Sequence, residues 1–329
     1  MTIRVVCYGL GPIGIGIARL ALARTGIDVV GAIDLDPQKI GQSLGALVGG
    51  PASGVIVSGD AAATLRTTKP DVVLHATSSS LAKVADQLVQ IAGSGAHVVS
   101  TCEELAYPWT AQPQLAAELD SAARRAGITL LGTGVNPGYA MDALPLMLTA
   151  PCAQVRGVRV LRIVDAARRR GPLQRKVGAG LTPAEFEARV ADGSVRHVGL
   201  PESLHMLATR LGWQLDKMDD SIAAVLADAP IVTDFVQVAA GQVAGVRQIA
   251  RGFVAGREVL NLELQMYVGA PEPCDSVEID GDPPVRMTIA GGLHGDVATA
   301  AIVVNAASSV VRAAPGLASM AEVPLVHYS

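Results

Sequence analysis

The sequence predicts an α/β fold: an N-terminal Rossmann-type, doubly wound parallel sheet, followed by a second α+β domain with a largely antiparallel sheet. Short β-rich runs alternate with helical stretches up to about residue 135. A glycine motif stands between the first run and the first helix, and beyond about Val155 strictly alternating segments appear. With 329 residues, 50% hydrophobic and 17% charged, the chain is long enough for two domains with substantial cores.

The first domain is predicted from six short apolar runs that read as strands. They cover residues 3–9, 28–34, 54–59, 71–77, 97–101 and 128–133. Between them, residues 15–24 and 81–95 have helical spacing, and the second segment ends at glycines suited to a C-terminal cap. Strands connected by helices form parallel sheets, so we expect a dinucleotide-binding domain over residues 1–137.

The second domain is predicted from alternating strands and tight turns. In residues 259–268 apolar and polar side chains alternate, which is typical of a half-buried antiparallel strand, and the segment is expected to pair with residues 246–254 through the turn between them. Residues 276–281 and 285–291 form a second expected hairpin around Gly-Asp-Pro-Pro.

Three helices are expected in the C-terminal half of the chain. They cover residues 182–193, 201–213 and 296–314, with Thr182 and Asp296 as N-caps. We assign residues 138–295 to the second domain, and residues 296–329 to a helix and tail that return towards the first.

Composition excludes several classes of protein. A net charge of −4 and only ten aromatic residues argue against nucleic-acid binding. The four cysteines are far apart, so we expect no metal site and no disulfide framework. The uncharged run 40–59 contains six glycines and a proline, and the glycine-interrupted N-terminus does not read as a signal peptide. A cytoplasmic protein without a membrane partner is therefore expected.

A dinucleotide site is predicted by GxGxxG. Its residues are Gly9, Gly11, Pro12, Ile13 and Gly14. Glycines permit the turn, the approach of a pyrophosphate to the backbone, and the packing of helix on strand. Asp34 ends the second strand twenty residues after Gly14, where an acid usually bonds the ribose 2′-hydroxyl. Asp34 favours NAD, but Lys39 could tolerate the phosphate of NADP, so either cofactor is expected.

Three further turns follow strands at the same predicted edge. Thr77 and Ser78, next to the nicotinamide ribose, and Asn136, next to the carboxamide, complete the expected cofactor site. His75 is expected to be an interior histidine. Glu103 and Glu104 stand where a carboxylate could hold a substrate ammonium, accept its proton and stabilise an iminium, although a helix-terminal acid pair explains them as well.

A mainly apolar substrate pocket is predicted from aromatic residues that flank these turns. Its expected walls are Tyr107, Trp109 and Tyr139. His294, in the turn before the last helix, is a further candidate for this pocket, with an interface role and a purely structural turn as open alternatives. The basic residues 168–170, 175 and 176 read as a solvated loop or as a grip for a substrate carboxylate.

Together, residues 8–18, 100–109, 132–142, 173–182 and 291–306 resemble the 2,4-diaminopentanoate dehydrogenase family and the related native amine dehydrogenases. The resemblance implies a two-domain fold of the dihydrodipicolinate reductase type and an NAD(P)-dependent homodimer whose second-domain sheets pack together. It also implies a glutamate, Glu103 or Glu104, that anchors the amine.

The expected activity is oxidative deamination of a primary amine to a ketone or aldehyde, and its reversal with ammonia. The alternatives are 2,4-diaminopentanoate dehydrogenase proper, an imine reductase similar to dihydrodipicolinate reductases, and a protein that senses NAD(P) without catalysis.

Overall fold

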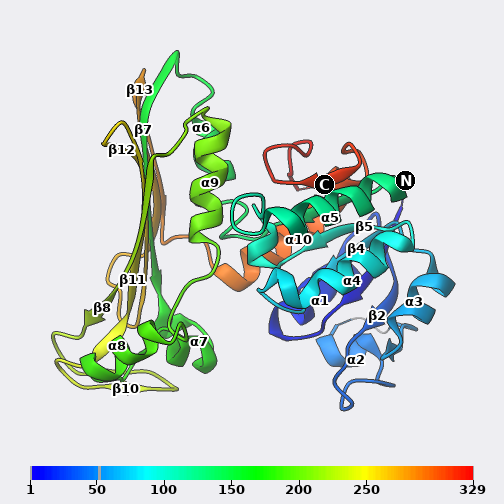
Figure 1. Ribbon diagram of the computed structural model, residues 1–329. Helices are drawn as coiled ribbons and strands as arrows, with labels where there is room; N and C mark the ends of the chain where they lie inside the picture. Colours follow the sequence, from blue (N-terminus) through cyan, green and yellow to red (C-terminus); the bar gives the residue numbers. More distant parts are fainter. Residues whose placement is uncertain (1, 51–52, 329) are drawn as a thin grey trace. The chain divides into compact units, whose positions relative to one another are not determined.

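The chain folds as two compact units in the computed structural model, which describes residues 2–50 and 53–328 (Figure 1). One unit consists of the chain up to Tyr139 together with the residues from Gly295 onward, and the other is Ala140–His294. We describe each unit by itself.

The first unit contains a seven-stranded parallel sheet in the order β15-β6-β5-β4-β1-β2-β3. The strands are β1 (Ile3–Tyr8), β2 (Ile27–Ile33), β3 (Val57–Ser58), β4 (Val72–His75), β5 (His97–Ser100), β6 (Thr129–Gly132) and β15 (Gly316–Ala318). The six predicted strands are confirmed, and the order reverses between β1 and β4, as in dinucleotide-binding sheets. The sequence pattern did not predict β15, which is too short to show a period.

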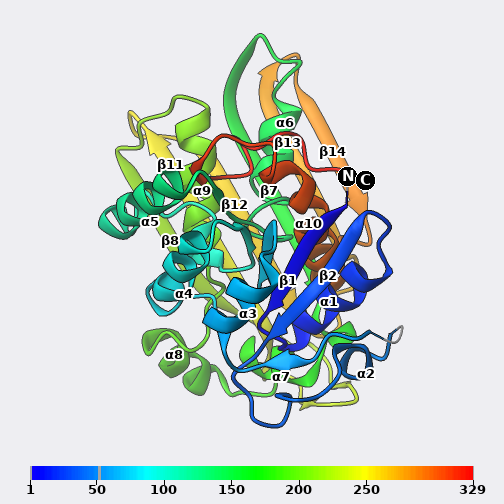
Figure 2. The same cartoon turned by 90° about the vertical axis from the view of Figure 1, so that its right-hand side faces the viewer.

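Helices cover both faces of this sheet (Figure 2). They are α1 (Pro12–Ala23), α2 (Leu44–Val48), α3 (Ala61–Thr68), α4 (Leu81–Gly93), the 3₁₀ helix η1 (Glu103–Leu105), α5 (Pro113–Ala126) and α10 (Gly295–Val310). Helices α1, α2 and α10 share one apolar cluster with the sheet, whereas α3, α4 and α5 share the other.

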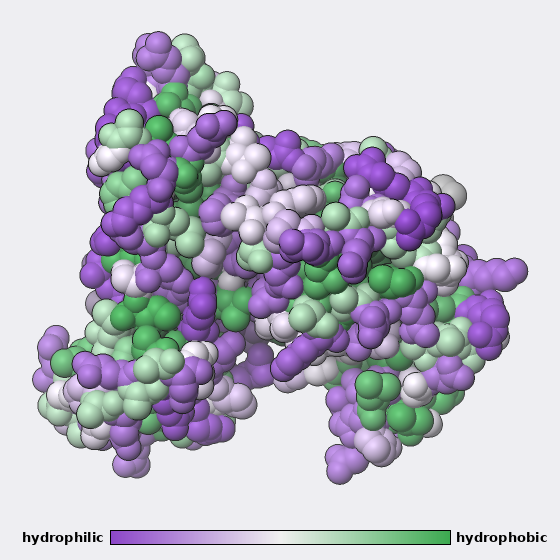
Figure 3. All heavy atoms as spheres, in the orientation of Figure 1, coloured by the Kyte–Doolittle hydropathy of each residue, from purple (hydrophilic) through white to green (hydrophobic). Residues whose placement is uncertain are grey.

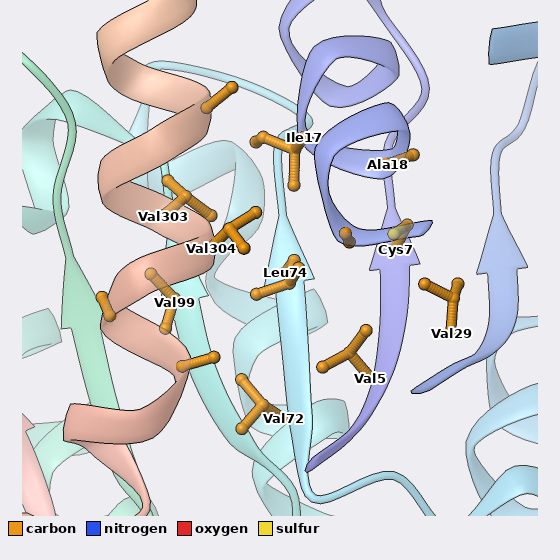
Figure 4. Packing of buried hydrophobic residues seen from close by; sticks show 14 of the residues in the cluster. Val5, Cys7, Ile17, Ala18, Val29, Val72, Leu74, Val99, Val303 and Val304 are labelled. Carbon is orange, nitrogen blue, oxygen red and sulfur yellow. The ribbon is translucent and has the colours of Figure 1, made fainter. Parts of the chain in front are cut away.

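Helix α10 lies in the core because its residues are apolar nearly all round. Figure 4 shows Val303 and Val304 packed towards Leu74 and Val99 of the sheet. The predicted N-cap at Asp296 is wrong: the helix begins one residue earlier, at the buried Gly295, and the carboxylate lies in the first turn. An acid is still favourable there, because it faces the positive end of the helix dipole.

The second unit contains a six-stranded sheet in the order β14-β13-β7-β12-β11-β8. Its strands are β7 (Gln154–Asp165), β8 (Lys217–Leu226), β11 (Val243–Val254), β12 (Arg257–Tyr267), β13 (Cys274–Asp282) and β14 (Val285–Ala290), and β9 (Ile231–Val232) pairs with β10 (Gln237–Val238). All neighbours in the larger sheet are antiparallel except β12 and β7. The predicted fold class and both predicted hairpins are confirmed.

The alternation in β12 has the predicted consequence for burial. Leu260, Leu262 and Leu264 are fully buried, whereas Asn261 and Glu263 are only half-buried. The helices of this unit are α6 (Ala143–Leu148), η2 (Ala166–Arg168), α7 (Gly171–Lys176), α8 (Pro183–Ala191) and α9 (Leu200–Arg210). The predicted helices α8 and α9 are confirmed, and Thr182 caps α8.

The visible surface mixes hydrophilic and hydrophobic residues (Figure 3). In the part of the chain that the structure describes, no helix is long and apolar enough to cross a membrane. Within the same residues, no group of three or more His, Cys, Asp or Glu side chains is arranged to hold a metal ion.

Candidate functional site

The glycine loop connects β1 to α1 and leaves open space at the start of the helix. A β carbon at Gly9 would lie 2.4 Å from the Ala76 carbonyl oxygen, and one at Gly14 would lie 1.8 Å from the Gly9 carbonyl oxygen. A β carbon at Gly11, the N-cap of α1, would meet nothing within 4 Å. Two of the glycines are therefore needed for packing, and the third keeps room for a ligand.

The start of α1 fits a pyrophosphate. Pro12 has no N–H, and the first intrahelical hydrogen bond is donated by Ile15 to Gly11, at 2.8 Å. The amides of Ile13 and Gly14 precede it, at the positive end of the helix dipole, which is the arrangement that binds phosphate groups.

Asp34 ties the end of β2 to the glycine loop. Its Oδ2 accepts a hydrogen bond from the Leu10 amide at 2.6 Å, and its Oδ1 accepts one from the Asp36 amide at 2.8 Å. Burial alone would raise the pKa of Asp34, but these amides and Lys39 outweigh it and lower the pKa. The carboxylate is thus ionised and fixed between the end of β2 and the glycine loop.

Lys39 is shared between two carboxylates. Its Nζ lies 3.3 Å from Oδ2 of Asp34 and 3.3 Å from Oδ2 of Asp36. The three side chains together carry a formal charge of −1, so Lys39 gives this corner of the site no net positive charge.

The two glutamates after β5 begin the same turn, η1, and both are half-buried. Oε2 of Glu104 accepts hydrogen bonds from the Leu81 amide, at 2.7 Å, and from Nε2 of Gln112, at 2.8 Å. Glu104 therefore fixes the N-terminus of α4, which is the structural role expected of a helix-terminal acid. Glu103 is half-buried at the start of η1, and this turn packs against Gly132 of β6, where a β carbon would lie 2.4 Å from the Leu105 carbonyl carbon.

The turn that contains Asn136 follows β6 and is held by α10. The Val135 amide donates a hydrogen bond to Oγ1 of Thr299 at 3.2 Å. Gly138 has a φ of +121°, and a β carbon there would lie 2.4 Å from the Gly134 amide nitrogen, so the turn closes tightly on itself. Thr133, at the end of β6, has a buried hydroxyl with no hydrogen-bond partner among the described residues. The Thr133 hydroxyl is therefore able to form a hydrogen bond with a ligand at this edge of the sheet.

Two of the predicted aromatic walls, Tyr107 and Trp109, follow the glutamate turn and are largely packed. Tyr107 is buried, Trp109 packs against the cluster shared by α4 and α5, and their ring centroids are 4.9 Å apart. Tyr139 is half-buried at the end of the first segment of this unit. Their contact with a substrate stays a prediction.

His294 belongs to the other unit, where it lines a cavity of about 160 Å³ with Arg168 and Arg169 of the predicted basic cluster. The segment before it is fixed by a buried ion pair. Nη1 of Arg162 lies 2.5 Å from Oδ1 of Asp275, and both side chains also bond the Leu293 backbone.

The sequence pattern missed a hydrogen-bond network at the carboxyl edge of the first sheet. His75, expected to be interior, is fully buried and contacts Ser100, Gln87 and Thr77. Its position at the end of β4, beside the turn of Thr77 and Ser78, was the available signal.

Comparison with known proteins adds independent evidence. Residues 139–328, more than half of the chain, match the family model for the 2,4-diaminopentanoate dehydrogenase C-terminal domain. A 2,4-diaminopentanoate dehydrogenase from Acetoanaerobium sticklandii is 30% identical over 98% of this chain and 94% of its own length.

Two solved structures are also similar. An amine dehydrogenase from Mycobacterium smegmatis has a TM-score of 0.87 and 29% identity, covering 100% of this chain and 98% of that chain. A dihydrodipicolinate reductase from Paenisporosarcina sp. TG-14 has a TM-score of 0.52 and 15% identity, covering 97% and 98%, which supports the fold alone.

Proposed function

We propose that this chain, which belongs to the 2,4-diaminopentanoate dehydrogenase family, is an NAD(P)-dependent amine dehydrogenase that deaminates a primary amine oxidatively and runs in reverse with ammonia. The observation that carries this proposal is that two adjacent carboxylates, Glu103 and Glu104, follow β5 at the carboxyl edge of the dinucleotide-binding sheet. Because Oε2 of Glu104 accepts hydrogen bonds from the Leu81 amide and from Gln112, we assign the substrate amine to Glu103.

The chain's own groups would hold the reactants in place. The start of α1 would bind the pyrophosphate, Asp34 the ribose, and the turns of Thr77, Ser78 and Asn136 the nicotinamide end. A bound oxidised nicotinamide supplies the hydride acceptor.

Glu103 would anchor the substrate and handle its proton. Its carboxylate pairs with the ammonium and accepts one N–H proton, which restores the nitrogen lone pair. As hydride leaves the neighbouring carbon, that lone pair forms the C=N bond, and the nitrogen remains hydrogen-bonded to Glu103. Water then adds to the iminium, and the adduct breaks its C–N bond to give a ketone or aldehyde and ammonium, while the proton held by Glu103 passes to solvent.

Turnover of a broad panel of amines, and of ketones and aldehydes with ammonia, tests the proposal when each is assayed with both cofactors. We expect activity in both directions. Binding of NADH or NADPH without turnover would instead indicate a sensing protein. Reduction confined to cyclic imines would indicate an imine reductase.

The four cysteines are free thiols, which supports a reducing, cytoplasmic location.

Cofactor preference is predicted to depend on Asp34. Asp34→Asn removes the negative charge at the ribose position, so the affinity for NADPH relative to NADH should rise about tenfold, as loss of roughly 1.4 kcal/mol of repulsion would produce. Fluorescence titration of both reduced cofactors measures the ratio. Asp36→Asn, which leaves the Leu10 contact in place, is the matched control; an unchanged ratio in Asp34→Asn would remove Asp34 from cofactor choice.

We further propose that the chain forms a homodimer through the six-stranded sheet. One face buries the leucines of β12, and α9 packs on it (Figure 1). The other face presents Leu161 and Ile163 among charged pairs such as Arg247 and Glu263, and has a hollow of about 460 Å³. Pairing this face with the same face of a second copy would remove the half-buried Leu161 and Ile163 from water.

The dimer has a direct test. Light scattering should give about twice the chain mass of 33.7 kDa, and Leu161→Glu should yield a monomer that still binds NADH. A wild-type monomer at micromolar concentration would contradict the proposal.

A further inference from the structure

His75 is the centre of a directional hydrogen-bond network under the carboxyl edge of the first sheet. Its Nδ1 lies 2.8 Å from Oγ of Ser100, and its Nε2 lies 2.8 Å from Oε1 of Gln87 and 3.0 Å from Oγ1 of Thr77. The Thr77 hydroxyl also donates to Oε1 of Gln87 at 2.8 Å. The side chain of His75 is fully buried.

The partners determine which nitrogen carries the proton. Oε1 of Gln87 only accepts hydrogen bonds, so Nε2 of His75 must donate, and Nδ1 is then an acceptor for the Ser100 hydroxyl. Burial lowers the pKa of His75 to about 4, and the edge of the Tyr8 ring packs against it with centroids 5.5 Å apart. The imidazole is therefore neutral at physiological pH and does not act as an acid in turnover.

Each end of the network reaches a turn that bears candidate site residues. Oγ of Ser100 accepts a hydrogen bond from the Cys102 amide at 3.1 Å, immediately before Glu103. At the other end, the methyl group of Thr77 would lie 2.9 Å from a β carbon at Gly9, so Thr77 rests directly on the glycine loop.

We propose that His75 is a positioning residue that holds the Glu103 turn and the cofactor turn at a fixed separation, through Ser100 on one side and Thr77 on the other. The effect of His75 on the Glu103 turn rests on the proposed function, whereas its effect on the cofactor turn concerns NADH binding alone. His75 contributes no charge and no proton to the reaction. Its contribution is to hold the Glu103 turn and the cofactor turn in position.

Two substitutions separate the two connections. In His75→Asn the amide oxygen can replace Nδ1 as acceptor for Ser100, but the shorter side chain loses Gln87 and Thr77. In His75→Gln the amide nitrogen can replace Nε2 as donor to these two, but the acceptor for Ser100 is lost. We expect His75→Asn to raise the Kd for NADH about tenfold with kcat changed less than about twofold, because the hydrogen-bonded connection to Gln87 and Thr77 is lost while that to Ser100 remains. We expect His75→Gln to lower kcat/KM for the amine about tenfold, with the NADH Kd nearly unchanged.

His97→Gln is the matched control. His97 lies at the amino end of β5, where its Nδ1 accepts a hydrogen bond from the Thr129 amide at 3.0 Å, far along the strand from the site edge. The His97→Gln substitution should lower the free energy of unfolding without changing kcat/KM for the amine or the Kd for NADH. If either His75 variant fails to fold, Ser100→Ala should reproduce the amine effect and Thr77→Val the cofactor effect.

The inference would be overturned if both His75 variants kept the wild-type kcat/KM for the amine and the wild-type Kd for NADH. It would also be overturned if each variant lost amine activity and NADH affinity equally, in proportion to its loss of stability. A wild-type protein that turns over no amine would refute the proposed function instead. In that case, comparing the Kd for NADH of His75→Asn with that of His97→Gln still tests whether His75 positions the cofactor turn.

Discussion

Glu103→Gln is expected to lower kcat/KM for an amine about 1,000-fold while the Kd for NADH stays within about twofold. Glutamine has nearly the same shape as glutamate but neither pairs with an ammonium nor accepts its proton, and general-base catalysis contributes roughly 10² to 10⁴ in rate. Steady-state kinetics together with fluorescence titration of NADH separates catalysis from cofactor binding.

Glu104→Gln is the matched comparison on the neighbouring residue. Its carboxylate accepts from Leu81 and Gln112, so we expect a loss of about 1 kcal/mol of stability and retention of most activity. An inactive Glu104→Gln beside an active Glu103→Gln would exchange the two roles. Full activity in both variants would refute the carboxylate mechanism.

The glycine loop supplies the second large effect. Gly14→Ala would bring its β carbon within 1.8 Å of the Gly9 carbonyl oxygen, so the loop must move. The affinity for NADH should fall about 100-fold, equivalent to roughly 2.7 kcal/mol, and the free energy of unfolding should also decrease. Titration and chemical denaturation measure the two losses separately.

Gly11→Ala should separate the loss of NADH affinity from the loss of stability. Its β carbon meets nothing within 4 Å and its φ of −65° suits alanine, so stability should stay within about 1 kcal/mol of wild type. NADH affinity should nevertheless fall, because the methyl group occupies the space left for the pyrophosphate. Gly93→Ala, at the open end of α4, is the neutral control. Unchanged NADH affinity in Gly11→Ala would place the dinucleotide elsewhere.

Local pattern was sufficient for most of the first sheet and for the two hairpins. The six β-rich runs and the glycine motif are short-range signals, because burial on both faces of a parallel strand and the steric needs of a tight turn both act within a few residues. The same holds for β12, whose leucines at alternate positions are fully buried.

Pairings between distant segments were not predictable in the same way. β15 pairs with β6 from almost two hundred residues away, and β7 inserts between β13 and β12 to make the one parallel pair of its sheet. No short-range period encodes such partners, since they depend on which edges remain open when the rest of the sheet has formed.

The sequence by itself determined the fold class, the glycine loop and a pair of adjacent acids at the end of a strand, since these depend on residue type and local spacing. Only the tertiary structure showed which groups Glu104 contacts and connected His75 to both turns. The physical reason is that a carboxylate or an imidazole has no role of its own: its partners, such as the Leu81 amide or the Ser100 hydroxyl, come from other strands and helices and meet it only when the chain is folded.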